Sequence, residues 1–550
     1  MRLPLSFSRT HSSFSYLILT IFYPLLVVTV LGIVIFPTSQ DYLDEIVSFG
    51  LLSLICYCLT VVSSAVKLRK FLYLASILGL GIFAFIKLSF YFHYDVKISA
   101  SALFVIFETH GSEASDFINN YLNIGVIGIL LLLFIPITYW LIVLFLRKGT
   151  LIYNHNAARS TIKNSFRLIT LYGVMGFSFY FIQKNYRPNN ILITALGSYK
   201  DYLITKENLK ENLAQKTNKH LVVSSTSDSP QTHIVIIGES TTNWHMQLYG
   251  YQRETNPLLS EIKDELIVFD SVIAPHVHTI LSLEKVLTLS NFENKNPENN
   301  YSIVQLANAG AYETFWISNQ KPVGIHESVT TIIGSAADHQ FFLATDDYQN
   351  HIYDEKVLPA LDSVLSRKDN KKMIFIQLIG THIAYKKRYP SKFEFFNEKE
   401  PLNYTDNNSK ALINEYDNAI RYNDSIVRSI IDKVKSEDLN STVLYFADHG
   451  DDVFDVMDYA GHNEYHATRP MFEVPFILWL SEKYKEQHPE FIPANELSKR
   501  RYSLEDFIHS FSDLSEIRFQ AYDSSRSIFS KDFIRRTRII KDSINYDERD

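Results

Sequence analysis

Two carboxylates and an imidazole in the second half of this chain follow short apolar runs, where an α/β protein is expected to carry chemistry. Glu239 comes just after the run 233–237, and Asp448 and His449 come directly after the run 442–447. Carboxylates and a histidine at neighbouring strand ends form a ligand set that suits zinc. An Asp-His pair after one strand is more often structural. With Glu239 in the same register, the structural and the metal-binding interpretations become about equally good.

A reacting group for such a site is available in residues 270–291, which contain the hydroxyls of Ser271, Thr279, Ser282, Thr288 and Ser290. An alcohol becomes a good nucleophile when a divalent cation lowers its pKa. Thr279 is the strongest candidate because it opens an apolar pattern at helical spacing, and a helix N-terminus favours an anionic phosphoryl group. Spacing alone nevertheless favours a simpler role, in which Thr279 only caps the helix.

The elements that position these residues are predicted to be buried strands of an α/β domain. Five short runs rich in Ile, Val and Phe fit parallel strands, at residues 233–237, 314–318, 373–379, 442–447 and 474–480. Helical stretches separate them. Polar residues directly follow four of the five runs, at the carboxyl ends where open α/β sheets bind their ligands.

The first third of the chain is predicted to lie in a membrane. Five stretches approach the roughly 20 apolar residues that cross a bilayer as a helix, at residues 16–36, 46–66, 71 to about 93, 123–146 and about 165–182. The first is long and lacks the cleavage pattern of a signal peptide, so we expect it to be retained.

The orientation of these spans follows from Lys and Arg, which are held on the cytoplasmic side. Ten of them lie at the N-terminus and in the loops after the second and fourth spans, whereas the opposite loops hold only two. Everything after about residue 184 is therefore predicted to lie outside the cytoplasm. Five spans suggest that the membrane part also handles a lipid, because one span would be enough for an anchor; a mere anchor is the alternative interpretation.

These patterns divide the chain into three parts. Residues 1–183 form a predicted transmembrane domain with five helices. Residues 184–224 are a polar connector with Tyr and Leu at helical spacing, which predicts a surface helix. Residues 225–550 form the predicted α/β catalytic domain.

Composition and charge exclude several classes of protein. Hydrophobic residues make up 46% and aromatic residues 14% of the 550 positions, which excludes a disordered or fibrous chain. Residues 1–183 carry a net charge of +5 and the remainder −12, so no broad basic face for nucleic acid is expected. The two cysteines, Cys56 and Cys58, lie in a predicted span. A metal site in the polar part must therefore use His, Asp, Glu or hydroxyl ligands.

Six segments in a fixed order resemble one known family. They read HIVIIGESTTNWHMQLYGYQRETNP from residue 233, TFWISNQ from 314, LIGTHIAYKKRYP from 378, YDNAIRYND from 416, YFADHGDDVFD from 445 and GHNEYHATRPMFEVPF from 461. Together they resemble the lipopolysaccharide phosphoethanolamine transferases, which include lipid A, mobile colistin-resistance and core-heptose enzymes. The resemblance covers essentially the whole chain. It implies five N-terminal transmembrane helices followed by a periplasmic domain of the alkaline phosphatase/sulfatase type.

The same resemblance implies a metal site and a nucleophile. Glu239, Thr279, Asp448 and His449 match the family's zinc ligands, with Thr279 as the nucleophile that becomes modified with phosphoethanolamine. One zinc ion is implied, and a second is possible in the family. This implied role for Thr279 replaces the helix cap that spacing alone favours.

Further residues are implied to contact the substrate. His382 and His462 match positions where the family places histidines around the transferred group or a second zinc. Asn319 and Lys321 match polar contacts to the phosphoryl or ethanolamine group. His466 lies close to His462 in the sequence and is expected to be a surface or structural residue.

Two departures from the family pattern bear on the acceptor. The lipid A branch has several disulfides in its soluble domain, and this chain can form none there. Position 451 is Asp where many relatives have Glu, which shortens a side chain near the predicted metal. The segments beginning at residues 314, 380 and 463 resemble the core-heptose branch more closely, and they favour that acceptor over lipid A.

The expected protein is an enzyme of the bacterial inner membrane with its catalytic domain in the periplasm. It would move phosphoethanolamine from phosphatidylethanolamine to lipopolysaccharide, on core heptose or lipid A, through a covalent threonine intermediate. The alternative is a phosphoglycerol transferase or phosphodiesterase of the same fold acting on another surface glycan. A sulfatase is disfavoured because no C/S-x-P-x-R motif lies near Thr279. An inactive scaffold is disfavoured because all four implied metal ligands are present.

Overall fold

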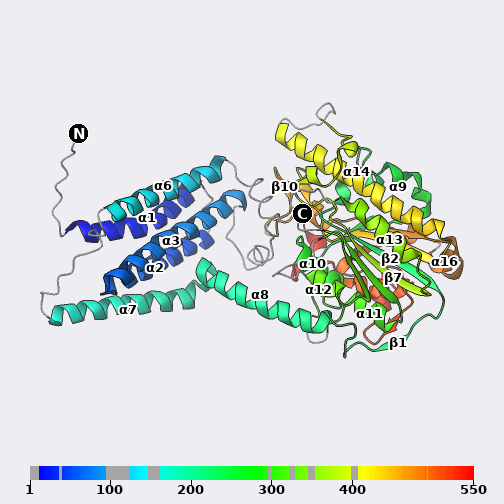
Figure 1. Ribbon diagram of the computed structural model, residues 1–550, viewed down its shortest axis with the longest axis horizontal. Coiled ribbons are helices and arrows are strands. Elements are labelled where there is room, and N and C mark those ends of the chain that lie inside the picture. Colours follow the sequence, from blue (N-terminus) through cyan, green and yellow to red (C-terminus); the bar gives the residue numbers. More distant parts are fainter. Residues whose placement is uncertain are drawn as a thin grey trace. The chain divides into compact units, whose positions relative to one another are not determined.

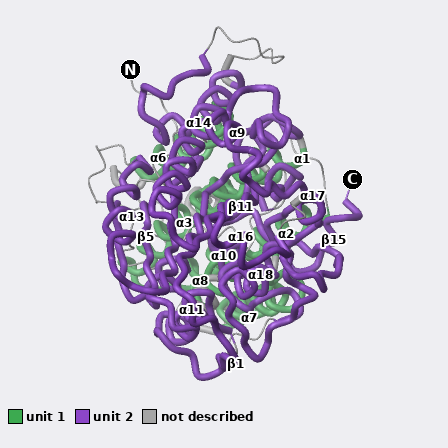
Figure 2. Tube along the Cα trace, turned by 90° about the vertical axis from the view of Figure 1, so that its right-hand side faces the viewer, with its two compact units in different colours: residues 1–109, 113–202 green, residues 110–112, 203–550 purple. Residues whose placement is uncertain are grey.

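The computed structural model describes residues 11–35, 40–94, 124–146, 161–294, 300–320, 329–344, 353–397, 407–464, 466–491 and 494–549. The chain divides into two compact units, which Figure 2 distinguishes by colour. Unit 1 comprises residues 1–109 and 113–202, and unit 2 comprises residues 110–112 and 203–550.

The described part of unit 1 contains five long apolar helices (Figure 1). They are α1 (His11–Ile35), α2 (Gln40–Val62), α3 (Val66–Tyr94), α6 (Ile124–Leu146) and α7 (Thr161–Asn185). Within the described residues, all five are long and apolar enough to cross a membrane, over Tyr16–Ile33, Tyr42–Val62, Val66–Phe92, Ile124–Val143 and Ser165–Asn185. The five predicted spans are therefore confirmed as helices of that length and composition.

A buried ion pair lies within the helix packing of unit 1. Lys87 Nζ of α3 lies 2.8 Å from Glu45 Oε2 of α2, and both side chains are almost fully buried. Charges in an apolar surrounding are expected to be paired, since a lone one is costly there. Tyr42 of α2 also donates from its hydroxyl to the carbonyl of Val28 in α1 at 2.6 Å. These contacts fix α2 against both of its neighbours.

A single helix, α8 (Ile191–Leu213), follows the last apolar helix, where the sequence predicted a helix in the connector. Asn190 caps its start, because the side-chain oxygen accepts from Ile193 N at 3.2 Å. The Asn190 amide also donates to Ser48 of α2 at 3.0 Å. At the other end of α8, Leu209 and Leu213 pack into the core of unit 2.

Unit 2 is built on one seven-stranded sheet with the strand order β3-β11-β8-β2-β7-β5-β6. The central strands are β2 (Gln231–Gly238), β8 (Ser441–Ala447) and β7 (Lys371–Gln377), which run parallel to one another. On one side of them lie β5 (Glu313–Ser318) and β6 (His339–Phe342), also parallel. On the other side lie β11 (Phe476–Leu480) and β3 (Leu266–Val268).

Helices cover both faces of the sheet, which explains why the central strands are continuous apolar runs. Along β2, Ile234 and Ile236 enter one core while Val235 and Ile237 enter the other. The first core includes residues of α9 (Pro257–Glu261), α13 (Val357–Leu365) and α14 (Asn407–Ser436). The second includes residues of α10 (Thr279–Val286), α11 (Ile303–Ala309), α12 (Val329–Gly334) and α18 (Phe507–Leu514). Figure 1 shows α14 and α9 on one side of the strands and α11 and α12 on the other.

The structure corrects part of the strand prediction. All five predicted strands exist, but β11, predicted at 474–480 as a parallel strand, is antiparallel to both of its neighbours. An apolar run does not encode the direction of a strand, because both directions bury the same side chains. The edge strands β3 and β6 were not predicted, since they are only three and four residues long.

Candidate active site

The two carboxylates and the imidazole follow the carboxyl ends of two adjacent strands, β2 and β8, and therefore lie close together. Gly238 of β2 pairs in register with Ala447 of β8, so Glu239 and Asp448 leave the sheet side by side. The Asp448 backbone N–H also donates to the Gly238 carbonyl at 3.1 Å. The strand ends β8, β2, β7 and β5 are neighbours in the sheet. The prediction that polar residues gather at this edge is therefore confirmed.

Thr279 lies within hydrogen-bond distance of this group. Its hydroxyl donates to Glu239 Oε1 at 2.9 Å, and it lies 3.4 Å from His449 Nε2. His449 Nε2 is 3.4 Å from Glu239 Oε1 and 3.5 Å from Asp448 Oδ2. Ligand atoms of Glu239, Asp448 and His449 all lie within 4.8 Å of one another, and all three residues are buried. The four residues implied by the resemblance thus converge on one point.

The position of Thr279 tests the interpretation that this residue only caps a helix. Thr279 is the first residue of α10, and the preceding His278 is the N-cap. The hydroxyl of Thr279 points to Glu239 instead of closing the helix end, so the cap interpretation is wrong. A group bonded to this hydroxyl would stand at the start of α10, where free backbone N–H groups and the helix dipole favour negative charge.

The hydrogen bonds of the three buried groups leave electron pairs directed at a common point. His449 donates through Nδ1 to the carbonyl of Gly450 at 3.0 Å, which leaves the Nε2 lone pair available. Asp448 Oδ1 accepts from the backbone N–H of Ser240 and of His449, at 3.1 and 2.8 Å. Asp448 Oδ2 is buried and has no hydrogen-bond partner in the described part of the chain. Such an oxygen is costly to bury unless a cation binds it.

Glu239, Asp448 and His449 shift the pKa values of one another because their charges lie close together. Burial opposes the negative charge of Glu239, but the hydrogen bond and the positive charge of His449 outweigh it and lower the Glu239 pKa. Burial and the neighbouring Glu239 charge raise the pKa of Asp448. Burial also disfavours charge on His449, yet the charges of Asp448 and Glu239 raise its pKa to about 10. Without a metal the group holds protons that a divalent cation would displace.

A second set of contacts surrounds His462. Its Nδ1 lies 2.7 Å from Asp451 Oδ1, and Asp451 Oδ2 accepts from the hydroxyl of Tyr385 at 2.7 Å. The His462 ring packs edge-to-face on two other imidazoles, with ring centroids 4.3 Å apart for His449 and 5.0 Å apart for His278. Ligand atoms of His449, Asp451 and His462 also lie within 4.8 Å of one another. This group adjoins the first one through His449.

The remaining predicted residues have different surroundings. The His382 ring is close enough to contribute to the low pKa of Glu239. Asn319 donates to Asp354 Oδ1 at 2.7 Å, and Asp354 accepts from two backbone N–H groups at the end of β7. Lys321 lies outside the described residues. His466 is exposed, as expected for a surface residue.

Three residues near the site were given no individual role from the sequence. Gln320 donates to Glu239 Oε2 at 3.2 Å; the sequence placed it, with Asn319, among the polar residues at the end of a predicted strand. Tyr385 reaches Asp451, and its position three residues after His382 gave no indication of that contact. His278 precedes Thr279 and contacts His462 only through the fold.

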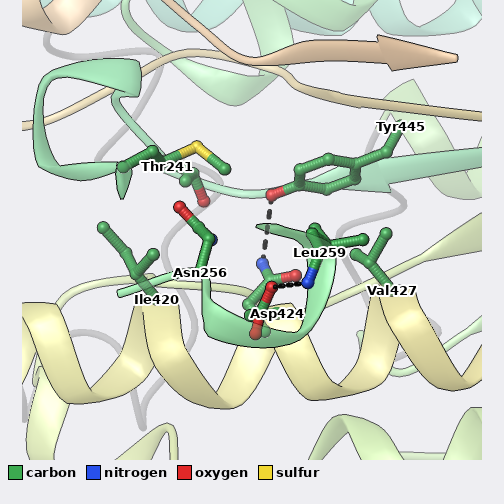
Figure 3. Close-up of a pocket in the computed structure, with 9 residues that line it drawn as sticks. Thr241, Asn256, Leu259, Ile420, Asp424, Val427 and Tyr445 are labelled. Carbon is green, nitrogen blue, oxygen red and sulfur yellow. Dashed lines mark hydrogen bonds between the residues drawn. The ribbon is translucent and has the colours of Figure 1, made fainter. Parts of the chain in front are cut away.

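A small space near the exit of β2 is structural. Figure 3 shows Thr241, Asn256 and Tyr445 around it, with Asp424 on the helix below. Asp424 accepts from two backbone N–H groups at the start of α9, at 2.9 and 3.0 Å. Burial raises the Asp424 pKa to about 7. These contacts fix α9 on α14.

Comparisons with known proteins show what this chain is similar to. The Sulfatase family model matches residues 231–517. Phosphoethanolamine transferase EptC of Escherichia coli strain RS218 is 32% identical over 85% of this chain and 84% of its own length. The C-terminal periplasmic domain of EptC from Escherichia coli, solved in complex with zinc, is 34% identical, with a TM-score of 0.56 over 60% of this chain and 95% of that one.

A full-length structure extends the likeness to the membrane helices. The integral membrane protein lipooligosaccharide phosphoethanolamine transferase A from Neisseria meningitidis covers 94% of this chain and 98% of its own, with a TM-score of 0.65. At 18% identity, it shows the shared fold. Fold and site therefore define a membrane enzyme with a catalytic domain of the alkaline phosphatase/sulfatase type. Within that class, the chain belongs to the phosphoethanolamine transferases.

Proposed function

We propose that this enzyme transfers phosphoethanolamine from phosphatidylethanolamine to lipopolysaccharide at the periplasmic face of the bacterial inner membrane, with Thr279 as a covalent carrier. Core heptose is the preferred acceptor and lipid A the second. The observation that carries the proposal is the hydroxyl of Thr279, 2.9 Å from Glu239 and 3.4 Å from His449 at the start of α10.

The residues present suit a zinc ion. Glu239, Asp448 and His449 offer two carboxylate oxygens and one imidazole nitrogen, and Thr279 offers an alkoxide as the fourth ligand. The buried Asp448 Oδ2 and the free lone pair of His449 Nε2 support this assignment. Bound zinc would lower the pKa of the Thr279 hydroxyl and stabilise negative charge on the phosphoryl oxygens.

The reaction proceeds as two displacements at phosphorus. In the first, Thr279 loses its proton, its Oγ1 forms a bond to phosphorus, and the bond from phosphorus to the diacylglycerol oxygen breaks. The released diacylglycerol takes up a proton. In the second, a hydroxyl or phosphate oxygen of the acceptor bonds to phosphorus and Thr279 leaves with a proton restored.

Histidines around Thr279 are proposed to hold the transferred group and to move these protons. The His462 ring is oriented by Asp451, which leaves its Nε2 for the substrate. His382 is proposed to contact the phosphoryl oxygens. Asn319 and Lys321 are proposed to contact the phosphoryl or ethanolamine group, and the buried Asn319 Oδ1, which has no hydrogen-bond partner among the described residues, supports this for Asn319.

The donor and the location are consistent with the apolar helices of unit 1. Phosphatidylethanolamine is a membrane lipid, and the diacylglycerol product must return to the bilayer. The excess of Lys and Arg in alternate loops favours a cytoplasmic N-terminus, which puts the catalytic domain in the periplasm after five spans.

Peptide mass spectrometry tests the proposal. Detergent-purified protein is incubated with phosphatidylethanolamine, alongside Thr279→Ala, a chelator-treated sample and a sample given phosphatidylglycerol instead. A phosphoethanolamine adduct on the peptide that contains Thr279, dependent on zinc, is expected only with phosphatidylethanolamine. An adduct formed from phosphatidylglycerol would favour the phosphoglycerol transferase, and no adduct from either lipid would refute the covalent threonine.

A further inference from the structure

One carboxylate outside the metal group holds the segment that leads into Thr279. Glu464 Oε2 accepts from the backbone N–H of Val277 at 3.1 Å, and Glu464 Oε1 lies 2.9 Å from His276 Nδ1. The Glu464 side chain is 9% exposed and that of His276 is 8% exposed. Both oxygens of one buried carboxylate are thus used on two consecutive residues, and Thr279 follows two positions later.

The C-terminal hairpin supports the same segment from another side. It consists of β14 (Ile539–Ile540) and β15 (Ile544–Asn545). Lys541 donates from its backbone N–H to the carbonyl of Pro275 at 2.9 Å and from its ammonium to the carbonyl of Glu464. Asp542 Oδ2 lies 3.9 Å from His276 Nε2, and Asp542 Oδ1 lies 3.3 Å from Lys285 of α10.

The turn of this hairpin is held in a costly conformation. Lys541 and Asp542 have φ angles of 53° and 61°, in the left-handed region that side-chain-bearing residues rarely adopt. Two such residues in succession persist only when their surroundings fix them. Here they are fixed by their contacts with Pro275, Glu464 and His276.

We propose that Glu464 is a positioning residue for the nucleophile: by holding Val277 and His276 with its two carboxylate oxygens, it fixes the Thr279 hydroxyl in line with the phosphorus of the donor. This inference rests on the proposed function, because it assumes that Thr279 is the nucleophile. Glu464 does not touch the reacting atoms. Its effect is on the geometry of the attack, to which reaction rates are very sensitive.

Two substitutions separate this role from packing and from charge. Glu464→Met keeps the volume of the side chain but removes both acceptor oxygens. Glu464→Gln removes the charge but keeps an oxygen that accepts from the Val277 N–H. Its amide N–H can donate to His276 Nδ1, because the proton of that ring can sit on Nε2, which faces Asp542. If Glu464 acts through its hydrogen bonds, Glu464→Met loses the effect and Glu464→Gln keeps it. A role in packing or a role of the charge would not give this pattern.

A matched control lies elsewhere in the same unit. His488 and Glu490 form another His-Glu pair, with His488 Nδ1 3.1 Å from Glu490 Oε1, but the Glu490 side chain is 52% exposed. Glu490→Met removes the same chemical contact from a site that has no part in the proposed reaction.

The experiment follows the modification of Thr279 in the zinc-loaded, full-length protein in detergent, with saturating phosphatidylethanolamine at room temperature. Quenched samples are digested and the fraction of modified Thr279 peptide is measured against time. A positioning role predicts a rate constant about 10- to 100-fold lower for Glu464→Met, with the final modified fraction unchanged. Glu464→Gln is expected within about threefold of wild type and Glu490→Met is expected to match it.

Each other outcome has a defined meaning. A wild-type rate constant in Glu464→Met would overturn the inference and leave the proposed function intact. A Glu464→Met variant in which only the final modified fraction or the zinc content falls would also overturn it, because that result indicates a folding or metal-binding defect. An equally low rate constant in Glu464→Gln would overturn it too, because that result indicates a role of the charge. No adduct in the wild-type protein would overturn the proposed function and this inference with it.

Discussion

His462 and Asp451 form a direct pair, with His462 Nδ1 2.7 Å from Asp451 Oδ1, although eleven positions separate them. Asp451 is buried and its second oxygen accepts from the hydroxyl of Tyr385. The imidazole is therefore held in one orientation beside His449. The short side chain of Asp451 reaches both of its partners directly.

The Asp451 pair predicts a measurable loss of turnover. We expect Asp451→Asn to lower the rate of phosphoethanolamine transfer about 10- to 100-fold, because a neutral amide replaces the carboxylate that orients the His462 ring and stabilises positive charge on it. Tyr385→Phe removes one hydrogen bond to Asp451 and should cost less. Turnover is measured as release of diacylglycerol from phosphatidylethanolamine. Full turnover in Asp451→Asn would show that the negative charge of Asp451 has no role in the reaction.

Zinc is expected to stabilise the folded protein through Asp448. At a zinc concentration 100-fold above its Kd, a site that binds only the folded state adds about 2.7 kcal/mol to the free energy of unfolding. Asp448→Asn should lose most of this gain, since the buried Oδ2 is replaced by a weaker ligand. The measurement is the thermal midpoint of chelator-treated protein with and without added zinc.

Asp438→Asn is the control for the zinc experiment. The Asp438 side chain is 84% exposed and pairs with Lys483 at the surface. It should show the wild-type rise in midpoint on addition of zinc. An equal rise in Asp448→Asn would place the metal elsewhere.

The sequence predicted the edge of the sheet where the site lies but not all of its members. Apolar runs bounded by Glu239 and by Asp448 are local signals, because strand and exit residue are adjacent in the chain. The direction of β11 was predicted wrongly, since the run that forms it is apolar in either direction. Glu464 contacts Val277 and Tyr385 contacts Asp451, which lie far from them in the chain. Such contacts between distant segments cannot be predicted from the spacing of residues in a single sequence.

The role of Thr279 shows the same limit in another form. Helical spacing favoured a cap, and only the structure shows that the hydroxyl turns to Glu239, 40 positions away. The family resemblance implied that Thr279 lies beside Glu239, because the resemblance compares motifs from separate parts of the chain. Asn319 was placed near the substrate by the same reasoning, and the structure shows its amide bound to Asp354.

The stability of unit 2 should depend on pH through His245. Its Nδ1 lies 2.6 Å from Asp417 Oδ1 and its Nε2 lies 3.3 Å from Asp455 Oδ2. Burial opposes a charge on this ring, but the two carboxylates outweigh burial and raise its pKa to about 10. Because the folded state holds the proton more tightly, the contribution is full below the unfolded pKa of 6.5 and is lost as pH rises through 10.

His245→Gln tests this dependence. We expect it to lower the free energy of unfolding by about 1 to 3 kcal/mol at neutral pH, because the buried Asp417 loses one of its two charged partners and keeps only Arg253. The difference in thermal midpoint from wild type should shrink between about pH 7 and pH 10.5. His220→Gln, at an exposed position, should leave the midpoint unchanged. A difference that stays constant over this range would mean that His245 is neutral in the folded protein.

Gly380 should be required for the placement of Glu239. It has a φ of 52°, and a Cβ atom there would lie 2.8 Å from both the backbone N and the backbone O of Glu239. We therefore expect Gly380→Ala to displace Glu239 and to weaken zinc binding at least about tenfold, besides a cost in stability of about 1 to 3 kcal/mol. Gly250→Ala separates these effects, because Gly250 has a φ of 101° but open space around it. That variant should lose stability through its backbone conformation and keep the wild-type zinc affinity, measured for both by competition with a chelator of known affinity. If both variants bind zinc as the wild type does, the close approach of Gly380 to Glu239 has no part in building the metal site.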